Sequence, residues 1–371
     1  MPAARRWVKV WDLPTRVFHW LLVGLVAVGV VTGFLTPERW MGVHVWAGYG
    51  LVALIVFRFI WGFWGPEYSR LVSFLYPPRR TLEHLRGLLL LQPPHYIGHN
   101  PTGALMVLAL GGVLLALVLT GLLVLGGEEK QGPLATVVSY ALGSAAKPVH
   151  RWLVYLLLVM VTGHVVGVLL ESLLTSDNLV RAIITGWKQL PPDTPVPTPR
   201  TAHPWLALVL LLGLGGATAA VLQRVAQSPP PYNIRLLSPN PLYQQECGAC
   251  HAALHPSLLP AASWLKLMHN LEEHFGENAV LEARVTRQLT LWLVSNAAET
   301  FDTEAANRFR RVAAEEPYRV SATPYWVRKH ADIAPEVFRR KSIQSRMNCQ
   351  ACHRDAASGR FDDQAIAIPE E

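Results

Sequence analysis

Two short motifs contain all four cysteines of this 371-residue chain. They are Cys247-Gly248-Ala249-Cys250-His251 and Cys349-Gln350-Ala351-Cys352-His353. Two thiols at this spacing can form thioether bonds to the vinyl groups of one porphyrin, and the adjacent imidazole then ligates the iron. The motifs therefore predict two covalently bound c-type haems, with His251 and His353 as proximal ligands. Haem attachment and thiol chemistry place this part of the chain outside the cytoplasm.

Other kinds of Cys-X-X-Cys site fit the sequence less well. A zinc ribbon needs its two pairs roughly 15 to 20 residues apart, whereas about a hundred residues separate these pairs. A thioredoxin-like redox pair needs a strand and helix around it, and the flanks here are rich in proline. The net charge of +7 comes from loop and outer-domain basic residues, and no motif supports nucleic-acid binding.

The composition of the first half of the chain indicates a membrane protein. Apolar residues make up 51% of the sequence and are unevenly distributed. A bilayer is spanned by roughly 20 apolar residues, and the first apolar stretch lacks the small-residue cleavage site of a signal peptide. Five stretches predict membrane spans, at about Val17 to Leu35, Gly42 to Trp61, Gly103 to Leu125, Val149 to Ser172 and Trp205 to Val221.

Loop charges predict the orientation of these spans. Basic residues gather in the N-terminal arm and in the connections Phe63 to Asn100 and Asp177 to Arg200. Few basic residues occur in the alternate connections, Thr36 to Met41 and Gly126 to Lys147. The basic segments belong in the cytoplasm, so an odd number of spans places the C-terminal part outside. We therefore expect a multi-pass protein of a bacterial inner membrane, with a cytoplasmic N-terminus and a periplasmic haem domain.

The predicted fold class is all-α. Residues 1–190 should form a transmembrane four-helix di-haem bundle, residues 191–227 a proline-rich linker (Pro191 to Pro199) and a fifth transmembrane helix, and residues 228–371 a small, mainly helical di-haem domain. Amphipathic helices on the inner membrane face, or solvated connections, are expected at Arg80 to Leu91 and Asn178 to Leu190. In the outer domain, helices are expected near Ala262 to Phe275, Glu282 to Ala297 and Thr303 to Ala314.

Four histidines lie within the predicted bundle, where histidine is costly and indicates function. His150 and His164 share one face of the fourth span, about 21 Å apart along the helix axis. By depth, His44 pairs with His150 at the outer side and His19 with His164 at the inner side, where helix tilt must bring the two level. The pairs predict two b-type haems. Iron with two axial histidines has no open position, so electron transfer is expected at the iron rather than catalysis.

Several different short motifs occur along the membrane part of the chain. They are His19-Trp20, His44-Val45-Trp46-Ala47-Gly48-Tyr49 with Arg58 and Trp61-Gly62-Phe63, Gly98-His99-Asn100-Pro101, and Asn178-Leu179-Val180-Arg181-Ala182 with Thr185-Gly186. Over roughly Arg6 to Leu190, the sequence resembles the bacterial cytochrome b561 family, which includes b-type subunits of nickel–iron hydrogenases. The resemblance implies a four-helix di-haem bundle that exchanges electrons with quinone, with His19, His44, His150 and His164 as iron ligands.

The C-terminal part carries a second set of motifs. They are Glu246 to His251, Leu259-Pro260-Ala261, Ser263-Trp264, His274-Phe275-Gly276-Glu277, and Cys349 to His353 with Gly359, Phe361 and Ile368-Pro369. Over about Pro241 to Pro369, the sequence resembles the di-haem cytochrome c family, which implies one haem in each of two lobes and histidine at both axial positions. The fusion through a fifth span departs from plain members of either family, so their separate partners do not carry over.

The distal ligands of the c haems must come from upstream of the second motif, because Arg354 to Glu371 contains no histidine or methionine. His274 and His330 are predicted, and His269 is the alternative for the first haem. Spacing alone does not separate these two, and the family resemblance favours His274. The full set of candidates is His255, Met268, His269, His274, His330 and Met347.

Some polar residues near the bundle have two interpretations. Arg58 and Arg151 could neutralise haem propionates or reach lipid headgroups. Among His84, His95 and His99 of the inner loop, one could donate a hydrogen bond to a quinone, and a solvated loop histidine is the simpler alternative.

The sequence as a whole predicts an integral-membrane electron carrier with two haem b and two haem c. Quinol would be oxidised near a b haem, and electrons would leave through the c haems to a soluble periplasmic acceptor such as a small cytochrome c. A quinol:cytochrome c oxidoreductase activity is compatible with this hypothesis. The alternatives are a superoxide- or quinone-linked redox enzyme, and an anchoring subunit of a larger respiratory or photosynthetic complex. Sequence leaves a homodimer open as well.

Overall fold

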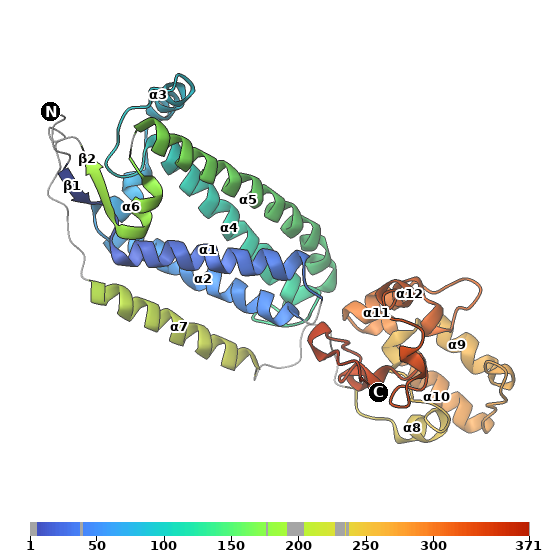
Figure 1. Ribbon diagram of the computed structural model, residues 1–371. Coiled ribbons are helices and arrows are strands. Elements are labelled where there is room, and N and C mark those ends of the chain that lie inside the picture. Colours follow the sequence, from blue (N-terminus) through green and yellow to red (C-terminus); the bar gives the residue numbers. More distant parts are fainter. Residues whose placement is uncertain are drawn as a thin grey trace. The chain divides into compact units, whose positions relative to one another are not determined.

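The computed structural model describes residues 6–37, 40–175, 177–190, 204–226, 234 and 237–370. The described parts are mostly helical, with one two-stranded sheet (Figure 1). The chain divides into two compact units, which are described separately. Unit 1 is Met1–Gly121 with Lys147–Arg224, and unit 2 is Leu122–Ala146 with Val225–Glu371. The predicted linker Pro191 to Pro199 lies outside the described residues.

Five described helices are long and apolar enough to cross a membrane, so the chain is a multi-pass membrane protein. Many of their large apolar side chains are exposed in the protein alone, as expected of helices that lipid tails cover. All five predicted spans are confirmed as helices. They are α1 (Leu13–Phe34), α2 (Met41–Trp64), α4 (Pro101–Gly127), α5 (Tyr140–Thr175) and α7 (Pro204–Ala226).

Helix α5 begins earlier than hydropathy predicts. It starts at Tyr140 rather than at Val149 and continues through Pro148. Residues 140–147 are mostly small or polar, so an apolar-run criterion misses them, although Leu142 and the three alanines favour a helix there. His150 therefore lies about three turns inside the helix at 3.6 residues per turn. The predicted connection Gly126 to Lys147 is correspondingly shorter than expected.

A small cap covers the end of the bundle at which α1 begins and α5 ends. Strand β1 (Arg6–Lys9) pairs antiparallel with β2 (Trp187–Leu190), in the register Lys9 with Trp187. The cap also contains α3 (Pro78–Leu89), η2 (Glu67–Ser69), η3 (Leu71–Phe74) and α6 (Leu179–Thr185). Its apolar centre consists of Val8, Val10, Trp11 and Ala182.

One of the two predicted amphipathic helices forms in the cap, and the other is interrupted. Helix α3 confirms the prediction at Arg80 to Leu91. The prediction of one helix from Asn178 to Leu190 is wrong, because α6 ends at Gly186, whose φ of 90° lies in the left-handed region. A Cβ atom there would lie 2.5 Å from the Trp11 carbonyl oxygen. Glycine lets the chain turn and pair with the N-terminal arm.

Unit 2 contains short helices around one apolar core that includes Leu259, Trp264, Leu289 and Leu293. Helix α10 agrees with the prediction at Glu282 to Ala297, whereas the neighbouring helices are shorter than predicted. Its α-helices are α8 (Pro241–Cys247), α9 (Ala261–His269), α10 (Ala283–Ser295), α11 (Glu304–Phe309) and α12 (Pro324–Lys329). Its 3-10 helices are η4 (Pro256–Leu258), η5 (Leu271–Glu273), η6 (Ala298–Thr300), η7 (Val320–Ala322), η8 (Val337–Arg339), η9 (Cys349–Ala351), η10 (Ala356–Ser358) and η11 (Asp363–Ala365).

Candidate haem sites

Three of the predicted ligand pairs have their imidazole rings at one common spacing. Metal–nitrogen bonds of about 2 Å, with about 1 Å from each nitrogen to its ring centre, put two axial imidazoles about 6 Å apart. The observed separations of the ring centroids match this value. They are 6.3 Å for His44 and His150, 6.2 Å for His251 and His274, and 6.2 Å for His330 and His353.

Hydrogen bonds orient both rings of the first pair in the bundle. The Nδ1 atom of His44, on α2, lies 3.1 Å from the Gly29 carbonyl oxygen and 3.1 Å from the Thr32 hydroxyl oxygen of α1. The Nδ1 atom of His150, on α5, lies 3.0 Å from the Thr120 hydroxyl oxygen of α4. Occupation of Nδ1 leaves Nε2 as the nitrogen that can bind a metal.

A glycine follows each of these two threonines and gives the ligand ring its space. A Cβ atom on Gly33 would lie 3.4 Å from His44 Cε1, and one on Gly121 would lie 3.3 Å from His150 Cε1. Each ligand therefore rests against a Thr-Gly pair of the preceding long helix. The sequence interpretation missed these pairs, although their signal is visible as the repeated Val-X-Thr-Gly at 30–33 and 118–121.

The second pair in the bundle, His19 on α1 and His164 on α5, lies toward the cap. The two side chains are within electrostatic range of each other. His19 packs edge-on against Trp20, with ring centroids 5.1 Å apart. Its Nδ1 atom is buried without a hydrogen-bond partner in the described part of the chain. His19 therefore lacks the Nδ1 partner that orients His44 and His150, and its pairing with His164 stays a prediction.

The first Cys-X-X-Cys-His motif faces His274 in unit 2. The rings of His251 and His274 are nearly parallel, with an interplanar angle of 14°. A backbone hydrogen bond of 2.8 Å from the His274 amide to the Glu277 carbonyl oxygen holds the turn that carries His274. This turn includes Phe275 and Gly276, both with positive φ.

The second motif faces His330, at the end of α12. The Nδ1 atom of His330 lies 2.8 Å from the Trp326 carbonyl oxygen, and its ring stacks on Trp326 at 4.2 Å. The Nδ1 atom of the opposite ligand, His353, is buried without a hydrogen-bond partner among the described residues. The structure thus brings both predicted distal histidines opposite the motif histidines.

The rival distal candidates have other contacts. The Nδ1 atom of His269 lies 2.9 Å from the Leu265 carbonyl oxygen of its own helix. His255 is buried, with Nδ1 2.7 Å from the Ser257 hydroxyl oxygen, and Met268 belongs to the apolar core. His330 makes the same kind of bond to Trp326, so the ring spacing decides the choice. His274 and His330 face the motif histidines at 6.2 Å, and this geometry favours them.

The four cysteines are free thiols in the polypeptide. Burial raises the pKa of the Cys247 and Cys349 thiols to about 11. Reactive redox cysteines have a lowered pKa instead, so a thioredoxin-like pair does not fit these motifs. No cluster of three or more metal-ligating side chains occurs within the described ranges. Thioether attachment of haem remains the chemistry that fits these residues.

The cap contains a buried polar network next to the second bundle pair. The Asn100 amide donates a hydrogen bond to Glu171, and Lys188 Nζ donates to the Tyr96 carbonyl oxygen at 3.2 Å. His95 Nδ1 lies 3.6 Å from Asp177 Oδ2, with half of the His95 side chain exposed. Polar groups therefore extend from the buried cap to its surface.

Two loop histidines are more buried than the simpler sequence interpretation assumed. His84 is fully buried, and its Nδ1 lies 2.9 Å from the Thr102 hydroxyl oxygen. His99 has a buried Nδ1 and lies between the rings of Trp11 and Phe74. Burial, followed by the charge of Arg58, lowers the pKa of His99 to about 3. The interpretation of both as solvated loop residues is therefore wrong.

Arg58 packs inside the bundle instead of reaching outward. It donates a hydrogen bond to the Ser69 carbonyl oxygen at 2.9 Å and lies over the Phe74 ring at 5.2 Å. Arg151, in contrast, is exposed on α5. Headgroup contact therefore fits Arg151 better than it fits Arg58.

Comparison with known proteins assigns both parts of the chain. The family profile of prokaryotic cytochrome b561 matches residues 10–186, and that of dihaem cytochrome c matches residues 243–361. A solved dihaem cytochrome c from Rhodobacter sphaeroides is 38% identical, with 34% of this chain and 100% of that chain covered and a TM-score of 0.27. This chain belongs to the dihaem cytochrome c family, fused to a cytochrome b561 domain. It is therefore a haem-binding membrane electron-transfer protein.

Relatives of the cytochrome b561 domain include a protein of Escherichia coli (strain K12) named "Probable Ni/Fe-hydrogenase 1 B-type cytochrome subunit". It is 27% identical, with 48% of this chain and 89% of the relative covered. A corresponding protein of Azotobacter vinelandii is 26% identical over 51% of this chain and 91% of its own length. The solved diheme cytochrome c of Shewanella baltica OS155 is 32% identical to the other domain, covering 36% of this chain and 96% of that chain, with a TM-score of 0.30.

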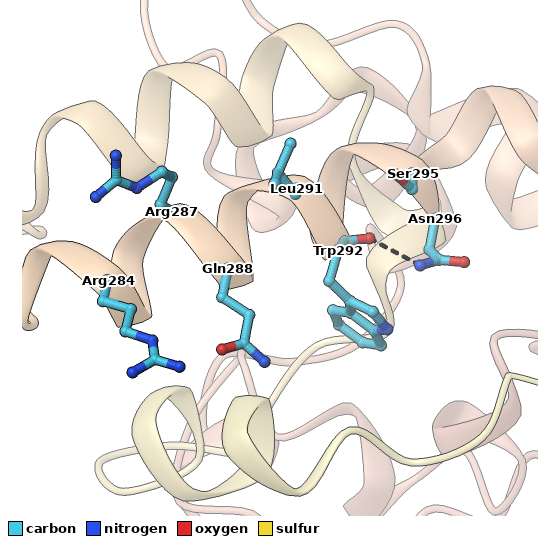
Figure 2. Close-up of a pocket in the computed structure, with 7 residues that line it drawn as sticks. All are labelled: Arg284, Arg287, Gln288, Leu291, Trp292, Ser295 and Asn296. Atoms are coloured by element: carbon cyan, nitrogen blue, oxygen red, sulfur yellow. Dashed lines mark hydrogen bonds between the residues drawn. The ribbon is translucent and has the colours of Figure 1, made fainter.

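The dihaem cytochrome c domain has an open hollow of about 560 Å³ along α10 (Figure 2). The Trp292 ring at this hollow lies 5.0 Å from Tyr243 of α8, the helix that ends at Cys247. An aromatic pair thus connects the hollow with the first haem motif. The lining residues are Arg284, Arg287, Gln288, Leu291, Trp292, Ser295 and Asn296.

Replacement of Gly121 by leucine should remove the haem held by His44 and His150. The added side chain would occupy space now taken by the His150 ring, 3.3 Å from a Cβ atom. We expect haem b to fall by about half, with covalent haem c retained, in a pyridine haemochrome assay. Gly111→Leu on the same helix is the matched control, because nothing lies within 4 Å of a Cβ atom there. Equal losses in both variants would contradict the assignment.

Replacement of His274 by alanine should open one axial position in the dihaem domain. We expect about half of the c haem to become high-spin and to bind carbon monoxide when reduced, because one of two bis-histidine irons loses a ligand. His269→Ala should leave the absorption spectrum and carbon monoxide binding unchanged. The opposite result, with carbon monoxide binding in His269→Ala alone, would assign the distal position to His269.

Proposed function

We propose that this protein oxidises membrane quinol and delivers the electrons to a soluble acceptor on the periplasmic side of a bacterial inner membrane. Two haem b and two haem c would carry them. The observation that carries the proposal is the common spacing of 6.2 to 6.3 Å in three histidine pairs. Both axial positions are then protein ligands, which suits electron transfer rather than substrate binding at iron.

The fusion itself supports an exit for electrons through the c haems. A covalently linked dihaem cytochrome c domain matters when electrons enter or leave on its side of the membrane. The basic segments of the bundle support a cytoplasmic location for the cap, including Arg79, Arg80 and Arg86 of α3. With five spans, the dihaem domain would then be periplasmic.

The buried network of the cap supports quinol oxidation near His19 and His164. Oxidation of a quinol releases two electrons and two protons, so nearby groups must accept protons. Because the lowered pKa keeps His99 neutral at pH 7, its imidazole can accept a hydrogen bond from a quinol hydroxyl. Glu171 and Lys188, followed by Asp177 and His95, would pass protons to the cytoplasmic surface.

The α10 hollow supports a docking site for the soluble acceptor. Arg284, Arg287 and Leu291 are exposed there, and Trp292 continues through Tyr243 toward the first haem motif. Basic and apolar groups around a short path to a haem suit an acidic redox protein, because complementary charge speeds encounter. A small acidic cytochrome c is the kind of acceptor expected.

A second candidate function is that of an electron-transfer subunit in a larger complex. The likeness of residues 10–186 to hydrogenase b-type subunits favours it. The two functions predict different activities for the purified chain in the absence of other subunits. Reduction of added cytochrome c by a quinol analogue, without another protein, supports the first function, and its absence supports the second.

The order of the haems can be tested with His44→Ala. Electrons from quinol should pass through the His44 and His150 haem to reach the dihaem domain, so the variant should reduce its c haems at least about tenfold more slowly. Stopped-flow absorbance after mixing with a quinol analogue measures this rate, and dithionite provides the control for intact c haems. Unchanged kinetics in a variant shown to lack that b haem would exclude this route.

Charge reversal on α10 should weaken the acceptor site. For Arg284→Glu combined with Arg287→Glu, we expect about a tenfold lower rate of cytochrome c reduction at low salt, because charge steering is lost. Haem content and internal c-haem reduction should stay unchanged. Reversal of Lys341, which is exposed and does not line the hollow, is the control. A similar loss from both changes would show that the effect is general charge rather than docking.

A further inference from the structure

The connection between α4 and α5 belongs to the same compact unit as the dihaem domain. Unit 2 joins Leu122–Ala146 to Val225–Glu371. The dihaem cytochrome c profile begins only at residue 243, and the solved relative of Rhodobacter sphaeroides is covered in full by 34% of this chain. The connection is therefore an addition to the dihaem domain that the fusion supplies.

Asp302 is the centre of the contact between this connection and the dihaem domain. Its Oδ2 atom accepts hydrogen bonds from Lys130 Nζ at 2.7 Å and from the backbone amide of Tyr140 at 2.8 Å. Tyr140 is the first residue of α5. A carboxylate at a helix N-terminus satisfies a free amide and interacts favourably with the helix dipole. A residue of the dihaem domain thus caps helix α5.

Lys130 is held in a buried and strained position. Its side chain is 2% exposed, and Nζ also donates to the Val138 carbonyl oxygen at 3.0 Å. Its φ of 54° lies in the left-handed region, which is unfavourable for a residue with a side chain. Burial of a lysine is costly unless the charge is paired. The pair with Asp302 explains why this conformation persists.

Further contacts join the connection to two other segments of the dihaem domain. Arg308 of α11 lies 3.7 Å from the buried Glu128 carboxylate and 5.7 Å from the Tyr140 ring centre. After the second haem motif, Arg360 donates to the Lys130 carbonyl oxygen at 3.3 Å, and Gln131 exchanges hydrogen bonds with Asp362 and Gln364. Residues 128–140 of the connection therefore contact two separate segments of the dihaem domain.

We propose that Leu122–Ala146 is a docking segment for the dihaem domain, anchored by Asp302 through Lys130 and the start of α5. The dihaem domain then works while bound to this segment, rather than as a mobile carrier on its linker. A connection that met the dihaem domain only transiently would keep its charged groups solvated, whereas its Lys130 and Glu128 are buried. Salt screens buried pairs weakly, so the docked state should persist at physiological ionic strength.

Hydrogen exchange of the full-length, haem-loaded protein tests the contact directly. In the wild type, amides of residues 138–142 should exchange slowly, and Asp302→Ala should accelerate them by about a hundredfold, because a buried pair loses one partner. Lys130→Met should accelerate exchange around residues 300–309 in return. Glu316→Ala, which removes an exposed ion pair with Arg319, is the matched control and should change neither segment.

The outcomes of this experiment distinguish a docked dihaem domain from an undocked one. Unprotected amides at 138–142 in the wild type, or unchanged protection in a haem-replete Asp302→Ala variant, would overturn the proposal. If that variant loses haem, Gln131→Ala is the milder test, and it should accelerate exchange around residues 360–364. Unchanged exchange there would overturn the proposal too. None of these measurements depends on quinol, so they stand apart from the proposed function.

A kinetic measurement tests the consequence for electron transfer. A mobile carrier must diffuse between turnovers, so its rate falls as solvent viscosity rises, whereas a docked domain is insensitive. In single-turnover reduction of the c haems, the wild-type rate should not change with added sucrose, and the Asp302→Ala rate should fall in proportion to viscosity. Viscosity dependence in the wild type would overturn the proposal.

Discussion

The spacing of paired imidazoles is the constraint on which the rest of this structure depends. Two rings can share one iron when their centres lie about 6 Å apart with the correct nitrogens facing each other. Neighbouring elements impose this arrangement. Thr32 and Thr120 hold the far nitrogens of His44 and His150, and Gly33 and Gly121 keep the space beside them free. In the dihaem domain, a backbone hydrogen bond holds the turn that carries His274, and the Trp326 carbonyl oxygen of α12 accepts a hydrogen bond from Nδ1 of His330.

Helix α5 carries residues that belong to several of these functions. It carries His150 and His164, its last turns contain Glu171 of the cap network, and Asp302 of the dihaem domain binds its first residue. A continuous helix keeps its ligands at a set rise per residue. The proposed docking contact therefore acts on the same helix that carries two of the predicted b-haem ligands.

Polar residues are used differently in the two units. In unit 1 the helices expose apolar side chains to lipid, and buried polar groups gather in the cap, where His99, Asn100, Glu171 and Lys188 lie together. In unit 2 the buried charges lie between the α4–α5 connection and the dihaem domain. Buried polar groups are costly without partners, so each of these clusters needs an explanation. We propose proton release for the cluster in the cap and docking of the dihaem domain for the cluster in unit 2.

The sequence by itself determined the five spans and the two haem motifs, because these depend on local composition and short spacing. Helix periodicity and depth predicted the pairs of bundle histidines, whereas the family resemblance favoured His274 over His269. The sequence misplaced the start of α5, missed the break at Gly186 and left His84 and His99 as surface residues. Only the tertiary structure decided the Thr-Gly pairs beside the ligands, the β1–β2 pairing and the Lys130 to Asp302 contact. Each of these contacts joins residues of separate elements. Which residues meet depends on how the elements pack, and the local sequence does not contain that information.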